Sequence, residues 1–187
     1  AERIPRYAEV TETYKELMED GKPFDSNFFL TDGVLGVFPS LTTAINNLNL
    51  RGIDSSVTFL LVDSYYGNES YPIEIGDVTG LDSVNTVTIK PATGIQTEIP
   101  GDINQTSATL LINNAGYVTV DGSNTIGGTT KDLTITALPY DVIPALQLNG
   151  STNHNTFKNV TFKSRNIGTS SGTVYLGVGT GIDNNIF

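Results

Sequence analysis

The sequence predicts an all-β protein built as a parallel β-helix, a solenoid in which each circuit of the chain stacks on the one before it. Its strand-like segments are short and alternate tightly, as in Val118 and Val120 or Leu133 and Ile135. Two-residue Asn-Gly turns do not link neighbouring strands, as a meander of hairpins would require. Weak self-similarity also recurs at a spacing of about 30 residues, which is a reasonable length for one solenoid circuit.

Residues 1–34 are expected to form a helical arm followed by a linker. Apolar residues spaced by three and four make one stripe, which consists of Tyr7, Val10, Tyr14, Leu17 and Met18. Pro5 suits a first helical turn, and Gly21 followed by Pro23 ends the pattern. The stripe therefore predicts an amphipathic arm that docks on another surface.

Residues 35–187 are expected to form the β-helix, which begins with a capping helix over residues 40–51. Ser40 is the expected N-cap and Gly52 ends the helix. The apolar face of this helix consists of Leu41, Ala44, Ile45 and Leu48. Such a cap covers backbone groups that an open coil would leave unpaired.

From residue 55 onward the apolar period is that of strands. The strand-like segments span residues 55–66, 71–78, 85–92, 108–114, 116–123, 132–138, 145–151, 158–164 and 172–178. They are rich in β-branched and aromatic residues, and most are bounded by Asn, Gly, Asp or Ser. No helical pattern interrupts them, so the predicted fold is β throughout this region.

The clearest repeat relates residues 145–157, ALQLNGSTNHNTF, to residues 174–187, VYLGVGTGIDNNIF. Phe157 and Phe187 are 30 positions apart, and residues 108–120 are a looser third copy. Asn tolerates the left-handed backbone of a sharp corner. The expected corner residues are Asn153, Asn155, Phe157, Asn184, Asn185 and Phe187. His154, the chain's one histidine, is expected to lie exposed outside such a corner.

Composition narrows the functional classes. The net charge is −10 and no basic cluster occurs, which argues against nucleic acid as a partner. The absence of cysteine excludes disulfides, thiolate metal sites and a cysteine nucleophile. No apolar run reaches the ~20 residues that span a bilayer, so no membrane insertion is expected. A surface rich in Asn, Thr, Ser and Gly, with only 16% charged residues, is typical of extracellular β-proteins.

Four segments follow one another in a characteristic order: FPSLTTAINNLNLRGIDSSVTFLLVDSYY, NTVTIKPATG, ATLLINNAGYVTVDGSN and TTKDLTIT. From about residue 35 to its end, the chain resembles the secreted domains of large cell-surface proteins of Bacteroidota, which are often linked to type IX secretion. The resemblance implies a right-handed parallel β-helix and an extracellular or cell-surface location. Because such proteins are usually much longer, the chain is expected to be an N-terminal part whose β-helix is incomplete at the C-terminus.

Three groups of residues are candidates for ligand binding. Tyr65, Tyr66 and Tyr71 lie among polar residues, and exposed tyrosine rings can stack on sugars. Asp121 and Asn124 belong to the loop-like DGSNTIGGTT and offer oxygen atoms to Ca²⁺, although the loop lacks the EF-hand pattern. Asp132 stands at the entry to a strand. No cofactor other than Ca²⁺ is expected.

Catalysis would require several carboxylates and a basic residue on adjacent circuits of one face. The available groups are Asp121, Asp132 and Asp183 with Lys131 and Lys158. They lack the dense carboxylate pattern of β-helix lyases and glycosidases, so turn roles are favoured and no catalytic residue is assigned.

The expected function is that of a non-catalytic structural or adhesive module that contacts glycans or neighbouring surface proteins. One alternative is a fragment of a polysaccharide lyase or glycoside hydrolase. In that case two or more carboxylates with a Lys or Arg should share one face. A second alternative is a homo-oligomer, namely an extracellular filament whose copies pair through the arm or through the open coil.

Overall fold

The computed structural model describes residues 28–30, 38–138, 143–165, 172–177, 179 and 181–187. The helical arm predicted within residues 1–34 lies outside the described residues. Of that stretch, the structure describes residues 28–30, which form the short strand β1 (Phe28–Leu30). Among the described residues, no helix combines the length and hydropathy needed to cross a bilayer.

The described strands form three sheets, and every pair of neighbouring strands is parallel. The first sheet contains β1, β2 (Val57–Leu61), β4 (Val87–Pro91), β7 (Val118–Asp121) and β10 (Thr156–Lys158), in that order. The second contains β5 (Thr97–Ile99), β8 (Leu133–Ala137) and β11 (Val160–Ser164). The third contains β3 (Ile73–Ile75), β6 (Leu110–Asn113), β9 (Leu146–Asn149) and β12 (Val174–Leu176). The predicted all-β class is therefore confirmed.

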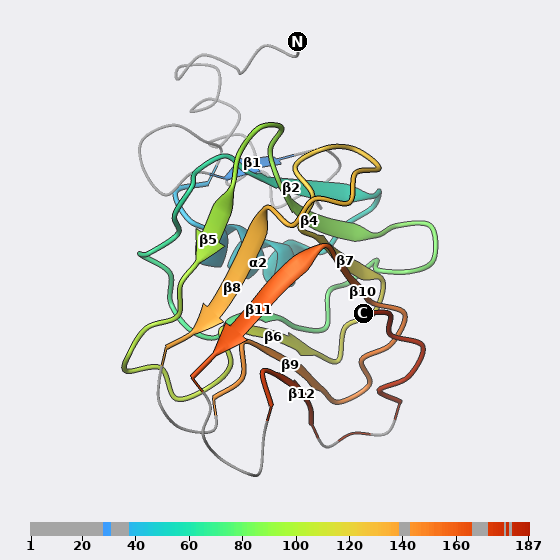
Figure 1. Cartoon of the computed structure of the whole chain (residues 1–187). Coiled ribbons are helices and arrows are strands. Elements are labelled where there is room, and N and C mark those ends of the chain that lie inside the picture. The colour runs from blue at the N-terminus through green and yellow to red at the C-terminus, as the bar shows by residue number, and fades with distance from the viewer. Residues whose placement is uncertain (1–27, 31–37, 139–142, 166–171, 178, 180) are drawn as a thin grey trace.

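The chain visits the three sheets in a repeating order, and one pass through them is here termed a circuit. After β4, β5 and β6 come β7, β8 and β9, and then β10, β11 and β12 (Figure 1). Val57 lies opposite Val87, 30 positions away, and Val87 lies opposite Val118, 31 positions away. Leu110 and Leu146 are partners at a spacing of 36 because that circuit has longer loops. The expected spacing of about 30 residues thus holds for some circuits and is exceeded in others.

Apolar side chains from successive circuits stack into rows inside the three sheets. Phe59 lies opposite Ile89, Ile89 opposite Val120, and Val120 opposite Phe157. All four side chains are buried. The ring of Phe157 also stacks on that of Phe187, with ring centroids 5.4 Å apart. The predicted alignment of these two phenylalanines is confirmed.

The single described helix, α2 (Leu41–Arg51), begins and ends as the sequence predicts. The Ser40 hydroxyl accepts a hydrogen bond from the Thr43 amide at 3.0 Å. Gly52 has a φ of 70° and its amide donates to the Leu48 carbonyl. The predicted apolar face, Leu41, Ala44, Ile45 and Leu48, is buried.

Helix α2 covers the edge of the third sheet at β3. The Asn49 side chain donates to the Glu74 carbonyl at 2.7 Å and accepts from the Gly76 amide at 3.0 Å. At the other end of the helix, the Glu69 carboxylate accepts from the amides of Leu41 and Thr42 at 2.9 and 2.6 Å. A carboxylate at a helix N-terminus accepts hydrogen bonds from amides that have no partner within the helix. Its negative charge also interacts favourably with the positive end of the helix dipole. These contacts hold α2 against β3, the edge strand of the third sheet.

One corner of the circuits is built by a column of left-handed residues. Tyr117, His154 and Asn184 have φ values of 58°, 56° and 51°. His154 is exposed as predicted, and its ring stacks on that of Tyr117 at a centroid distance of 5.0 Å. The expectation that Asn153 and Asn155 supply the left-handed bend is wrong, because His154 adopts it instead. Asn184 does take this role.

Asn155 has a different role, which depends on its buried side chain. Its Oδ1 atom accepts from the Val118 amide at 2.8 Å, and its Nδ2 atom donates to the Ala115 carbonyl at 3.1 Å. Nδ2 also donates to Asn185 Oδ1 at 3.0 Å, and Asn185 Nδ2 donates to the Thr152 carbonyl. Asn155 therefore connects three successive circuits.

Candidate functional site

The three tyrosines expected to bind sugars do not form one exposed platform. Tyr66 is fully buried and its hydroxyl accepts from the Val62 amide, so its predicted role in ring stacking on a ligand is wrong. The same burial raises the pKa of Tyr66 well above its usual range. Tyr71 is half-buried and donates to the Pro100 carbonyl at 3.0 Å. Of the three, only Tyr65 is exposed, at 55%.

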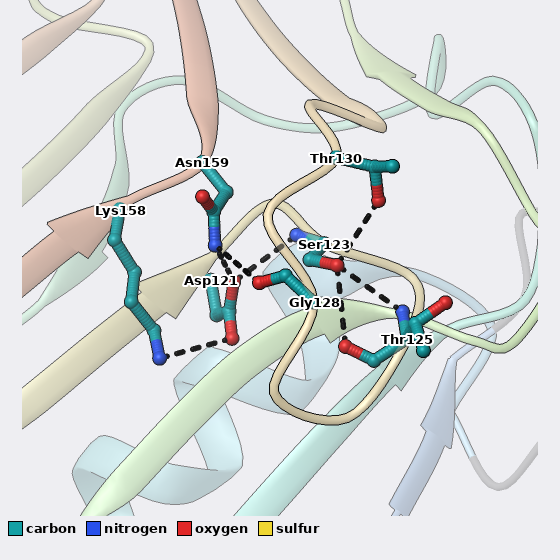
Figure 2. A network of polar contacts seen from close by, with 7 residues as sticks. All are labelled: Asp121, Ser123, Thr125, Gly128, Thr130, Lys158 and Asn159. Carbon is teal, nitrogen blue, oxygen red and sulfur yellow. Dashed lines mark hydrogen bonds and ion pairs between the residues drawn. The ribbon is translucent and has the colours of Figure 1, made fainter.

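Asp121 is the centre of a polar network at the end of β7 (Figure 2). Its Oδ1 atom accepts from the Ser123 amide at 3.1 Å and from Asn159 Nδ2 at 2.9 Å. Its Oδ2 atom lies 3.3 Å from Lys158 Nζ. Burial alone would raise the pKa of Asp121, but these hydrogen bonds and the Lys158 charge outweigh it and lower the pKa. The carboxylate is therefore an ionised anchor for the loop that follows.

The loop between β7 and β8 is tied together by its own side chains. The Ser123 hydroxyl lies 3.1 Å from that of Thr130 (Figure 2). The Asn124 amide donates to Asp132 Oδ2 at 3.1 Å, and Asn124 Nδ2 donates to the Ile95 carbonyl. Hydrogen bonds from Thr130, Asn124 and Gln96 lower the pKa of Asp132.

The structure brings Asp132 into the loop region of Asp121 and Asn124, but the polar groups of all three residues bond within that region. No group of three or more His, Cys, Asp or Glu side chains that could hold a metal ion occurs among the described residues. Asp183 lies at the corner beside His154, where its carbonyl accepts from the His154 amide. Asp183 therefore does not share the loop region that contains Asp121 and Asp132.

A groove of about 300 Å³ opens on the outer face of the second sheet. It is lined by Ser64, Gln96, Thr97, Glu98, Lys131, Asp132 and Thr134. Two carboxylates and one ammonium group thus share one face, although Asp121, Asp183 and Lys158 are not among its lining residues. Glu98 was not predicted as a site residue. Its position opposite Thr134 depends on a register that the sequence alone does not reveal.

A second groove, of about 430 Å³, opens on the outer face of the third sheet. Its lining is polar and uncharged, and it consists of Asn113, Gln147, Asn149, Gly150, Tyr175 and Gly177. These residues come from β6, β9 and β12 and from the turns that follow β9 and β12. We call this feature the amide groove.

The strand register explains why these side chains meet. Ile112 and Leu148 point into the core as partners, so the next pair, Asn113 and Asn149, faces outward. Gln147 lies opposite Tyr175 on the same outer face. Gln147 Nε2 donates to Asn149 Oδ1 at 3.0 Å, which fixes both amides.

Gly177 keeps the amide groove open. A Cβ atom at this position would lie 1.9 Å from Asn149 Oδ1, so any larger residue would displace that amide. Sequence reasoning missed this groove, although the outward positions of LLIN, LQLN and VYL carried a signal in their Asn, Gln and Tyr residues.

Comparisons with known proteins give this chain no relative: it matches no protein-family model, and no curated protein or solved structure shows significant similarity to it.

Proposed function

We propose that this chain is a right-handed parallel β-helix that acts as a non-catalytic structural or adhesive module outside the cell, where it contacts glycans through the amide groove. The repeated passage through three parallel sheets supports the β-helix. The right-handed winding and the extracellular location are the expectations drawn from the sequence and are part of this proposal. A stack of circuits also provides a stiff, extended surface.

The amide groove is the observation that carries the binding function. Sugars present many hydroxyl groups, which exchange hydrogen bonds with side-chain amides such as those of Asn113, Gln147 and Asn149. They also present apolar ring faces, which pack against an aromatic ring such as that of Tyr175. A groove with amides, one phenol and no charged lining residue suits a neutral glycan.

A glycan array probed with the purified chain tests this proposal. We expect binding to neutral glycans that falls roughly fivefold or more in Tyr175→Ala, since stacking on an aromatic ring contributes about 1 kcal/mol or more. Tyr65→Ala is the control, because Tyr65 is an exposed tyrosine that lies outside the amide groove and forms a bridge to Glu98 of the second sheet. Equal binding by the wild type and Tyr175→Ala, or a loss in Tyr65→Ala alone, would refute the assignment.

A second candidate function is polysaccharide cleavage in the groove of the second sheet. Glu98, Asp132 and Lys131 line that groove together, as such an enzyme requires. Hydrogen bonds lower the pKa of Asp132 and keep it ionised, which suits a base or nucleophile. Glu98 is the second carboxylate of this groove. The test is the release of new reducing ends from common polysaccharides, with Glu98→Gln expected to abolish it. Release that persists in Glu98→Gln would count against this groove.

A further inference from the structure

We infer that the amide groove takes an internal segment of a neutral, linear polysaccharide, laid across β6, β9 and β12 rather than along any one strand. This inference rests on the glycan-binding function proposed above and specifies its ligand. It is carried by the way outward side chains line up from one circuit to the next.

Two rows of outward side chains cross the strands of the third sheet. One row passes through the register partners Glu74, Leu111, Gln147 and Tyr175, of which Leu111 is buried and only Gln147 and Tyr175 line the groove. The other contains Asn113 and Asn149. Neighbouring strands are about 4.8 Å apart, so the two groove residues of each row lie at roughly the spacing of one sugar residue in an extended chain. A polymer laid across the strands therefore meets Gln147 and Tyr175 in one row and Asn113 and Asn149 in the other.

The floor and the openness of the groove favour an internal segment over a chain end. Gly150 and Gly177 contribute no side chain that could close around a terminal sugar. Recognition of an end needs a wall that rejects the next residue of the polymer. The amide groove instead lies on a sheet face whose rows extend beyond it, to Glu74 on β3.

The charges around the groove select against acidic polymers. No Lys or Arg is among the lining residues, and Glu74 stands at one end of the row, where its Oε1 accepts from Asn113 Nδ2 at 2.9 Å. The net charge of −10 adds a general repulsion of polyanions. A neutral polysaccharide meets neither obstacle, whereas a polyuronate meets both.

Calorimetric titration of the full chain with oligosaccharide series tests the inference. The probes are β-1,4-linked glucose, xylose and mannose oligomers of two to six residues, together with oligogalacturonates of the same lengths. For at least one neutral series we expect affinity to rise roughly tenfold or more from the dimer to the tetramer and then to level off, as each added contact strengthens binding. Oligogalacturonates should bind at least roughly tenfold more weakly than that series.

Variants locate the polymer on the sheet. Asn113→Ala and Tyr175→Ala, on opposite sides of β9, should both weaken the tetramer, whereas a dimer too short to span the groove should lose affinity in at most one of them. Tyr175→Phe keeps the stacking ring and should retain the length dependence. Thermal melts confirm that each variant is folded.

The outcomes separate this inference from the function on which it rests. Affinity that is the same for dimers and hexamers, or that disappears when the chain ends are capped, overturns the internal-segment assignment but leaves glycan binding intact. Stronger binding of oligogalacturonates overturns the neutral class. No binding of any glycan removes the proposed function itself and the inference with it.

Discussion

Asn155 is the residue on which the corner of the circuits depends. Its side chain is fully buried and satisfies the amide of Val118 and the carbonyl of Ala115, both of which belong to the preceding circuit. A buried backbone group without a partner is costly, so a small side chain at this position would leave two such groups unpaired.

We expect Asn155→Ala to lower the free energy of unfolding by about 2 to 4 kcal/mol. The Val118 amide and the Ala115 carbonyl would each lose a hydrogen bond at a cost of about 1 to 3 kcal/mol, which water entering the site would partly offset. Urea denaturation measures the effect. Asn153→Ala is the matched control: its side chain contacts the exposed His154 ring at 2.8 Å, and we expect a change within about 0.5 kcal/mol. Equal losses in the two variants would contradict the role given to Asn155.

Substitutions of His154 test whether the corner requires a residue that tolerates a left-handed backbone. A β-branched residue disfavours a positive φ strongly, so His154→Val should destabilise the protein by about 2 kcal/mol. His154→Asn places at this corner the residue type that Asn184 already provides one circuit later, and should change stability by less than about 1 kcal/mol, the scale of the lost stack on Tyr117. Thermal unfolding of both variants checks the order. A Val variant as stable as the Asn variant would show that the backbone strain is not decisive.

At the scale of elements, the loop between β7 and β8 is held by an ionised Asp121. Its pKa is lowered in the folded state, so its contribution to stability is present above the ordinary value of 3.8 and is lost as the pH falls through the folded-state pKa. Lys158 is half-exposed, so the ion pair itself contributes little beside the hydrogen bonds from Asn159 and Ser123.

We therefore expect wild type to be more stable than Asp121→Asn at pH 7, with the difference narrowing below about pH 4. Urea denaturation at pH 7, 5 and 3 measures it. Lys158→Met should cost less than about 1 kcal/mol at any of these pH values. A difference between wild type and Asp121→Asn that widens with acid would reverse the assigned sign.

Which elements were predictable depends on whether their causes are local. Helix α2 was predictable because Ser40, the apolar stripe and Gly52 lie within one short segment. The alignment of Phe157 with Phe187 was visible as a repeat. The amide groove was not predictable from the sequence. Asn113, Gln147 and Tyr175 belong to three circuits, and only the strand register shows that they lie close together. The same limit hid the burial of Tyr66, since nothing local distinguishes it from the exposed Tyr65.

At the scale of the whole molecule, stability should follow the stacking of the circuits. Strands of the inner circuits have a partner on both sides: β4 lies between β2 and β7, and β6 lies between β3 and β9. Strands β11 and β12 each have one described partner, and apolar side chains there are more exposed, with Leu176 at 52%. In a stacked architecture each circuit is stabilised mainly by its immediate neighbours.

Native-state hydrogen exchange should therefore show a gradient along the stack rather than one uniform protection level. Amides of β4, β6 and β7 should exchange slowest and those of β11 and β12 fastest, because opening the latter breaks contacts on one side alone.

Phe157→Ala, which breaks the stack against Val120 and Phe187, should speed exchange in β10 and β11 more than in β2. Phe59→Ala, in the same row but three circuits earlier, is the matched control and should speed exchange throughout. Identical protection in β4 and β12 would show instead that the circuits unfold as a single unit.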